Sequence, residues 1–208
     1  MHTKVIKTIE PEWLAEAIKT LNSGGLVAFP TDTVYGLAAS LSSSTGVRRL
    51  FEAKGRESNK AIPVLVGSVD QVGKVAKEFT PDIHKLAQKF WPGPLTIVVP
   101  SLPGLPQELS PTPTIGVRMP DHADAISLLI ACGPLAVTSA NISNGPNPRT
   151  AAEVLDQLKG RIELVVDGGE TPGGVPSTVV DCSNTTGRRI VILRPGDITE
   201  EELLRALG

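Results

Sequence analysis

The sequence predicts an α/β fold in a single domain. Short apolar runs that read as strands alternate along the chain with segments whose apolar residues recur every three or four positions, a pattern typical of helices packed on a sheet. The chain has 208 residues, of which 40% are hydrophobic, and this suffices for one domain with a sizeable core. We find no internal repeat and no linker, so we expect residues 1–208 to form one unit.

The individual elements are predicted from periodicity and from capping residues. Trp13 and Leu21 lie on one face of the first helical pattern, and two glycines follow it as a C-cap. Thr150 and Thr199 each precede a helical pattern with a glutamate three residues later, which indicates a capping box. Helices are expected at residues 11–22, 45–53, 68–79, 81–90, 121–132, 150–158 and 199–207. Strands are expected at residues 26–30, 61–66, 95–99, 114–120, 135–138, 164–167, 177–181 and 190–193.

Composition narrows the class of protein. The formal net charge of -2 gives no global signal for nucleic-acid binding, and the four Phe, two Trp and one Tyr offer few stacking platforms for single strands. Cys132 and Cys182 lie far apart and in no metal-ligand spacing, which favours a reducing compartment. The start of the chain has no apolar leader, and no run approaches a membrane span. We therefore expect a soluble cytoplasmic protein without a metal cage.

The stretch Ala53-Lys54-Gly55-Arg56-Glu57-Ser58-Asn59-Lys60 organises the candidate site. It places three cations within seven residues, on a turn that glycine allows to bend tightly. Lys54 and Arg56, two positions apart, are expected to project the same way from an exposed loop toward a phosphate chain or a carboxylate. Taken alone, the stretch favours a solvated charged turn over a ligand site.

The same design recurs along the chain: a short strand, then small polar residues or a lone cation. Converging hydroxyls and cations suit a ligand with several anionic groups. Motifs of P-loop ATPases, serine hydrolases and zincins are absent from the sequence. The positions concerned are Thr31, Thr33, Lys54, Arg56, Arg118, Ser139, Asn141, Ser177, Thr178 and Arg194.

One further feature is the stretch from Pro100 to Pro113, which carries five prolines and no clear periodicity. It is too long for a tight turn, and loops of this length often form lids or binding loops. We expect it to cover a ligand site.

Six motifs in a fixed order resemble the YrdC-like family, the L-threonylcarbamoyladenylate synthases. They are Pro30 to Leu37 (PTDTVYGL), Lys54-Gly55-Arg56, Phe90 to Thr96 (FWPGPLT), Val117 to Pro120 (VRMP), Ser139-Ala140-Asn141 and Leu193 to Gly196 (LRPG). The family signature of Lys-x-Arg followed by Ser-x-Asn is met. The resemblance covers about residues 25–196 and is to the short, single-domain form.

The resemblance implies an open, twisted mixed sheet with flanking helices around a concave, electropositive cleft. It also implies a nucleotidyltransferase that forms threonylcarbamoyl-AMP and pyrophosphate from L-threonine, bicarbonate and ATP. ATP is expected to arrive with Mg²⁺, held mainly by phosphates and water. Downstream transferase proteins would pass the threonylcarbamoyl group to tRNA, beside the anticodon.

The resemblance also assigns residues to roles. The catalytic set is expected to be Lys54, Arg56, Ser139 and Asn141. Threonine is expected to bind at Thr33, Arg118, Ser177 and Thr178, with Arg118 on its carboxylate. ATP is expected to bind at Lys54, Arg56, Lys60, Thr114, Ser139, Asn141, Asn147 and Arg194. Lys60 departs from the asparagine of many members, and Leu65 from the histidine of some longer ones.

Two other functions stay open at this point. A basic cleft also suits a module for double-stranded RNA or tRNA, because A-form RNA is recognised by shape and backbone contacts. A non-catalytic paralogue is the other alternative. The resemblance extends to YrdC-like proteins with no settled activity and to a related domain that works in carbamoyl transfer during hydrogenase maturation. The paired motifs at Lys54/Arg56 and Ser139/Asn141 favour the enzyme.

Overall fold

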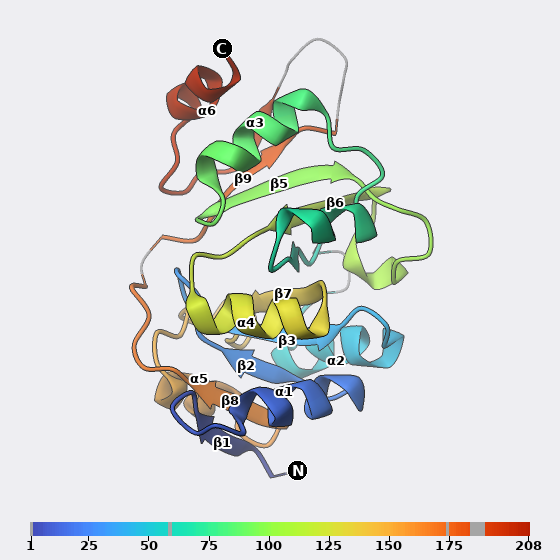
Figure 1. The fold of residues 1–208 in the computed structure, drawn as a ribbon. Coiled ribbons are helices and arrows are strands. Elements are labelled where there is room, and N and C mark those ends of the chain that lie inside the picture. Colours follow the sequence, from blue (N-terminus) through green and yellow to red (C-terminus); the bar gives the residue numbers. More distant parts are fainter. Residues whose placement is uncertain (1, 58–59, 174, 184–189) are drawn as a thin grey trace.

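A mixed sheet of ten strands runs through the computed structural model, which describes residues 2–57, 60–173, 175–183 and 190–208 (Figure 1). The strand order is β1-β8-β2-β3-β7-β4-β6-β5-β9-β10. The sheet contains both parallel pairs (β1 with β8, β8 with β2, β4 with β6, β5 with β9) and antiparallel ones, so the predicted α/β fold with an open mixed sheet is confirmed.

The helices and strands of the described chain follow the predicted order with three additions: β1, β3 and a short 3₁₀ helix at Gln107–Leu109. The strands are β1 (Lys4–Lys7), β2 (Val27–Phe29), β3 (Gly36–Ser40), β4 (Val64–Leu65), β5 (Leu95–Pro100), β6 (Thr114–Arg118), β7 (Leu135–Ser139), β8 (Leu164–Asp167), β9 (Thr178–Asp181) and β10 (Val191–Arg194). The α-helices are α1 (Trp13–Asn22), α2 (Ser44–Lys54), α3 (Pro81–Phe90), α4 (Ala123–Cys132), α5 (Ala151–Leu158) and α6 (Glu200–Leu207), and short 3₁₀ helices are η1 (Val69–Lys74) and η2 (Gln107–Leu109).

Three differences from the predicted elements have local causes. The helix expected at 68–79 is only the 3₁₀ helix η1, because Gly73 and three valines favour a helix poorly and Ala76 pairs instead with Ser101. Strand β3 was not predicted because nearly all of it is buried. Its sequence therefore lacks the alternation of apolar and polar residues that marks a half-buried strand. Strand β1 is a short edge strand that buries only Ile6.

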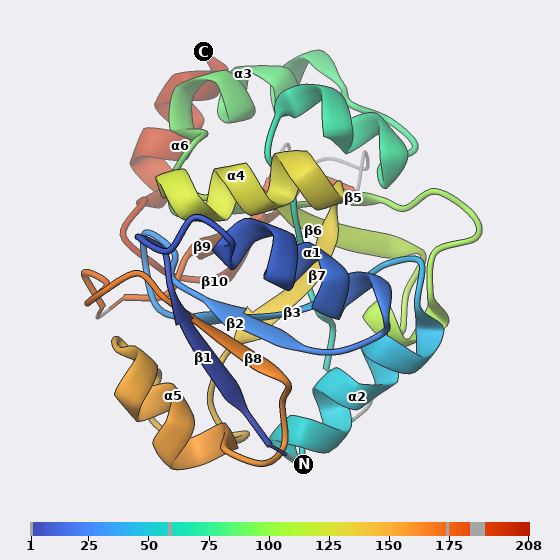
Figure 2. The ribbon, with the colours of Figure 1, turned by 60° about the horizontal axis from the view of Figure 1, so that its bottom comes forward.

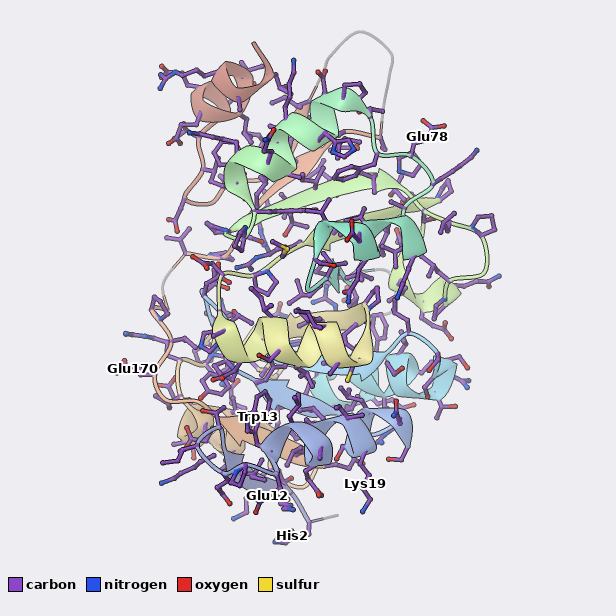
Figure 3. The ribbon with its side chains drawn as sticks, in the orientation of Figure 1. His2, Glu12, Trp13, Lys19, Glu78 and Glu170 are labelled. Atoms are coloured by element: carbon purple, nitrogen blue, oxygen red, sulfur yellow. The ribbon has the colours of Figure 1, made fainter. Side chains whose placement is uncertain are left out.

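Helices cover both faces of the sheet. On one face, α1 and α4 lie side by side and pack Leu21 and Leu128 against Phe29 and Val137 (Figures 1 and 2). The other apolar cluster joins α2, α3, α5 and α6 to the opposite side of the strands. Glu12 and Lys19, both exposed, lie on the outer side of α1 (Figure 3).

The predicted caps are largely confirmed. Thr199 accepts from the Glu202 N–H and Glu202 accepts from the Thr199 N–H, which completes the capping box of α6. Thr150 accepts from the Glu153 N–H as expected, but the Glu153 carboxylate accepts from the Arg149 N–H one residue earlier. The loop between β5 and β6 is anchored by Leu109, which is 2% exposed and accepts from the Ile62 N–H.

Candidate functional site

A cavity of about 460 Å³ opens over the centre of the sheet. Alternate residues of neighbouring strands form its floor: Gly116 and Arg118 from β6, Val137 and Ser139 from β7, and Val98 from β5. These residues belong to the same face that α1 and α4 cover farther along the sheet, since Val137 contacts that apolar cluster as well. The cavity is therefore the part of this face that the two helices leave open.

The charge of the cavity has one sign. Of the described residues that line it, three are charged, and all three are arginines: Arg56, Arg118 and Arg194. Burial, then the charges of Arg118 and Arg56, lower the pKa of Arg194. Burial also lowers the pKa of Arg56. Crowded, half-buried cations of this kind are stabilised by an anionic ligand.

Arg118 ends β6 and is held on three sides. Its Nε donates to the Gly93 carbonyl oxygen at 3.0 Å, its Nη1 to Thr33 Oγ1 at 3.3 Å and its Nη2 to Asp32 Oδ1 at 2.5 Å. The side chain is 8% exposed. The remaining hydrogens of Nη1 and Nη2 are left for a ligand, in the planar geometry that suits a carboxylate.

Arg56 follows the end of α2. Gly55 adopts the left-handed conformation (φ 58°, ψ 39°) that ends a helix, and this turns Arg56 away from the helix axis into the cavity. Its Nη2 donates to the Ala61 carbonyl oxygen at 3.0 Å. Its Nε is buried and has no partner among the described residues, so this donor remains for a ligand.

Arg194 ends β10 and is tied to the neighbouring strand. Its Nε and Nη2 donate to the Ser177 carbonyl oxygen at 3.1 and 2.8 Å, and Nη2 also lies 3.0 Å from Ser177 Oγ. Ser177 Oγ is in turn 2.8 Å from Thr96 Oγ1, and both hydroxyls line the cavity. This chain of contacts fixes the guanidinium at the cavity wall.

Lys54 does not lie where the sequence suggested. The expectation of an exposed turn with Lys54 and Arg56 projecting together is wrong, because Lys54 is the last residue of α2 and is 1% exposed. Its Nζ donates to the carbonyl oxygens of Ser139 and Asn141, both at 2.5 Å, and to Asn141 Oδ1 at 2.9 Å. Burial, then the charge of Arg56, lower the pKa of Lys54 to about 7.

The other candidate residues divide into two groups. Lys60 forms an ion pair with Glu57 at 3.8 Å, and Thr178 is buried against Ile198, to whose carbonyl oxygen it donates at 2.9 Å. Neither residue lines the cavity, and Asn141 and Lys54 do not either. The cavity brings together Thr33, Arg56, Thr114, Arg118, Ser139, Asn147, Ser177 and Arg194.

Sequence reasoning missed several residues of the site. Asp32 had a detectable signal, since it lies in the PTDT motif beside Thr33, yet nothing in the sequence pairs it with Arg118. Thr96 and Thr138 line the cavity from within strands, where polar residues can be recognised only once the face is known. Ser110 and Thr112 were also missed, and their hydroxyls form a hydrogen-bonded row with that of the predicted residue Thr114 along the rim of the cavity.

The described residues supply neither a metal-binding cluster nor a membrane-spanning helix. No group of three or more His, Cys, Asp and Glu side chains there could hold a metal ion. Cys132 and Cys182 are both unpaired. None of the described helices combines the length and the apolarity needed to cross a membrane.

Comparison with known proteins identifies relatives of this chain. The model of the Sua5_yciO_yrdC family, which carries the description telomere recombination, matches residues 19–196. The threonylcarbamoyl-AMP synthase of Pyrococcus abyssi is 41% identical over 200 residues, which are 95% of this chain and 58% of that protein. The threonylcarbamoyl-AMP synthase of Bacillus subtilis is 38% identical over 209 residues, which are 99% of this chain and 59% of that protein.

A solved structure agrees in fold. The crystal structure of P. abyssi Sua5 complexed with L-threonine superposes with a TM-score of 0.91 at 39% identity, and the match covers 100% of this chain and 61% of that one. The chain thus spans about three fifths of the length of these relatives.

Proposed function

This chain belongs to the Sua5/YciO/YrdC family, and we propose that it is a threonylcarbamoyl-AMP synthase. The reaction combines L-threonine, bicarbonate and ATP into threonylcarbamoyl-AMP, pyrophosphate and water, and it makes the enzyme a nucleotidyltransferase. The observation that carries the proposal is the open cavity whose charged lining consists of Arg56, Arg118 and Arg194, with hydroxyl groups between them. The names of the relatives and the threonine complex of P. abyssi Sua5 support it.

The amino acid would bind beside Arg118. Gly93, Thr33 and Asp32 accept three of the five guanidinium hydrogens of Arg118. The other two would donate to the carboxylate of the amino acid. Thr31 donates its own proton to the Val34 carbonyl oxygen at 2.6 Å, so the proton between the Thr31 and Thr33 hydroxyls comes from Thr33. Thr33 therefore offers a lone pair, which would accept a hydrogen bond from the amine or the hydroxyl of threonine.

The triphosphate would bind between Arg56 and Arg194. Both guanidinium groups face the cavity, and the unpartnered Nε of Arg56 is a donor that a phosphate oxygen would satisfy. Thr114, Asn147 and the hydroxyl row on the rim would surround the rest of the nucleotide. Mg²⁺ fits a site of hydroxyl and amide oxygens without carboxylates if the phosphates and water supply most of its ligands.

The chemistry needs positioning more than covalent catalysis. The amine of threonine would add to CO₂ derived from bicarbonate and lose a proton, and a carbamate oxygen would then attack the α-phosphorus as the bond to pyrophosphate breaks. Arg56 and Arg194 would stabilise the charge that moves to the leaving pyrophosphate. Because the residues of the amino-acid and phosphate subsites line one cavity, they would hold the reactants in line.

The product is a reactive mixed anhydride, so a further enzyme must consume it. We propose that transferase proteins take over the threonylcarbamoyl group and carry it to tRNA. The two unpaired cysteines fit a reducing compartment such as the cytoplasm.

The proposal is tested by pyrophosphate release from the purified protein. Release should require ATP, bicarbonate and L-threonine together, and omission of any one should abolish it. An RNA-binding module would instead retain duplex RNA with an affinity that falls steeply with salt, and it would release no pyrophosphate. Release that does not depend on threonine would contradict the proposal.

A further inference from the structure

Three oxygen acceptors surround the buried end of Lys54. They are the carbonyl oxygens of Ser139 and Asn141 and the side-chain Oδ1 of Asn141. An ammonium group has three hydrogens and satisfies all three acceptors, whereas a neutral amine has two hydrogens and a lone pair that would face a carbonyl oxygen. The main chain adds a further tie, because the Lys54 carbonyl oxygen accepts from the Ser143 N–H at 2.8 Å.

The ammonium, together with the Gly145 carbonyl oxygen, determines which way the Asn141 amide points. Because the ammonium form of Lys54 can only donate, the atom 2.9 Å from its Nζ must be the amide oxygen. The other end of the amide, Nδ2, donates to the Gly145 carbonyl oxygen at 2.7 Å. Both ends of the Asn141 side chain are thus satisfied within the protein, and Asn141 does not line the cavity.

The amide in turn determines the direction of the Ser139 hydroxyl. Ser139 Oγ lies 2.6 Å from Asn141 Oδ1, and since Oδ1 carries no hydrogen, Ser139 is the donor. A hydroxyl has one hydrogen, so the part of Ser139 that lines the cavity carries lone pairs and no proton.

We propose that Lys54 is a positioning residue, whose ammonium orients the Asn141 amide so that Ser139 faces the ligand as a hydrogen-bond acceptor. The inference rests on the proposed function and deepens it. Phosphate oxygens are acceptors, so the partner of Ser139 is a donor of the ligand. The donor is an N–H or an O–H, which threonylcarbamoyl-AMP and its precursors carry at the amine or carbamate nitrogen, the threonine hydroxyl, the ribose hydroxyls and the adenine amino group.

The first test compares Lys54→Met, Ser139→Ala and the double variant below pH 7. Each single variant should lower product formation about tenfold, the scale of one lost hydrogen bond at a site. The double variant should be no worse than Ser139→Ala alone, because Lys54 acts through Ser139. Multiplied losses in the double variant would overturn the proposal. Lys85→Met is the matched control, since Lys85 donates to the Leu207 carbonyl oxygen between α3 and α6, away from the cavity.

Pyrophosphate binding tests whether Lys54 or Ser139 contacts the phosphates directly. Calorimetry with pyrophosphate should give Lys54→Met and Ser139→Ala affinities within about twofold of the wild type. A loss as large as that of Arg56→Ala in either variant would mean that its side chain contacts the phosphates, and the proposal would fail. ATP, 2′-deoxy-ATP and 3′-deoxy-ATP then test the ribose: one of its hydroxyls is the partner if its removal slows the wild type but not Ser139→Ala, and otherwise the donor belongs to the amino acid or to adenine.

A measurement on the wild-type protein tests the role of Lys54 independently of the proposed enzymatic function. With ¹⁵N-labelled lysine, a buried ammonium held by three acceptors should give a slowly exchanging NH₃⁺ resonance below pH 7 that Lys54→Met lacks. Absence of that resonance in folded wild-type protein would overturn the role of Lys54. If the resonance is present but no protein forms product, the enzyme assignment fails while the arrangement around Lys54 stands.

Discussion

Asp32 and Arg118 lie 86 residues apart in the chain and meet at 2.5 Å between Oδ1 and Nη2. Their side chains are 12% and 8% exposed, so the pair is nearly removed from water. Asp32 balances the charge of the arginine that ends β6 and turns its remaining hydrogens toward the cavity. Asp32 of the PTDT motif therefore positions Arg118 without lining the cavity itself.

Asp32→Ala should lower the free energy of unfolding by about 3 kcal/mol, because it leaves Arg118 buried without its counter-charge. Urea denaturation of the two proteins measures this difference. Glu16→Ala is the control, since it breaks the exposed pair with Lys4 and should cost less than about 1 kcal/mol. An effect of Asp32→Ala no larger than that of the control would show that the pair does not stabilise the fold.

Arg118→Ala should weaken L-threonine binding by about 2–3 kcal/mol, the scale of a charge-assisted contact. ATP affinity should change much less, because the triphosphate is assigned to Arg56 and Arg194. Calorimetry with each ligand measures both effects, and Arg205→Ala on the exposed face of α6 serves as the control. Unchanged threonine affinity in Arg118→Ala would remove the amino-acid assignment.

Much of this architecture could be predicted from sequence, because strands and helices depend on local patterns. The order of the elements, the N-caps of α5 and α6 and the three arginines of the cavity follow from periodicity and motifs. The environment of Lys54 could not be predicted, since its three acceptors come from residues 85 and 87 positions away. A Lys-x-Arg spacing alone cannot reveal that a helix continues through the lysine and that Gly55 then turns only the arginine outward.

The loop between β5 and β6 should act as a cover. Ser110, Pro111 and Thr112 line the cavity, whereas Pro103 and Gly104 lie in a turn that does not. Deleting residues 110–112 should leave the fold intact but allow water to hydrolyse the mixed anhydride to threonine and AMP. Deleting residues 103–104 is the matched control and should not. Chromatographic quantification of product and AMP checks this, and equal yields from both deletions would argue against a cover.

Stability should depend on pH through Lys54. Burial, then Arg56, lower its pKa from 10.5 to about 7, so between these values the unfolded chain holds a proton that the folded chain has released. Lys54 should therefore make the free energy of unfolding rise with pH, by up to about 1.4 kcal/mol per pH unit. The rise should be clearest below about pH 9, because the raised pKa values of Cys132, Cys182 and Tyr35 oppose it at higher pH. Lys54→Met should lack the rise, which urea denaturation at several pH values can measure. Parallel pH profiles for the two proteins would contradict the lowered pKa.

The central claim is tested most directly by mass spectrometry of the product. Wild-type protein incubated with ATP, L-threonine and ¹³C-bicarbonate should form threonylcarbamoyl-AMP that carries one ¹³C. Arg56→Ala should form it about 10²–10³ times more slowly while remaining folded, because one preorganised donor at the phosphates is lost. Failure of the folded wild-type protein to form this labelled product, or equal rates in the two proteins, would contradict the account.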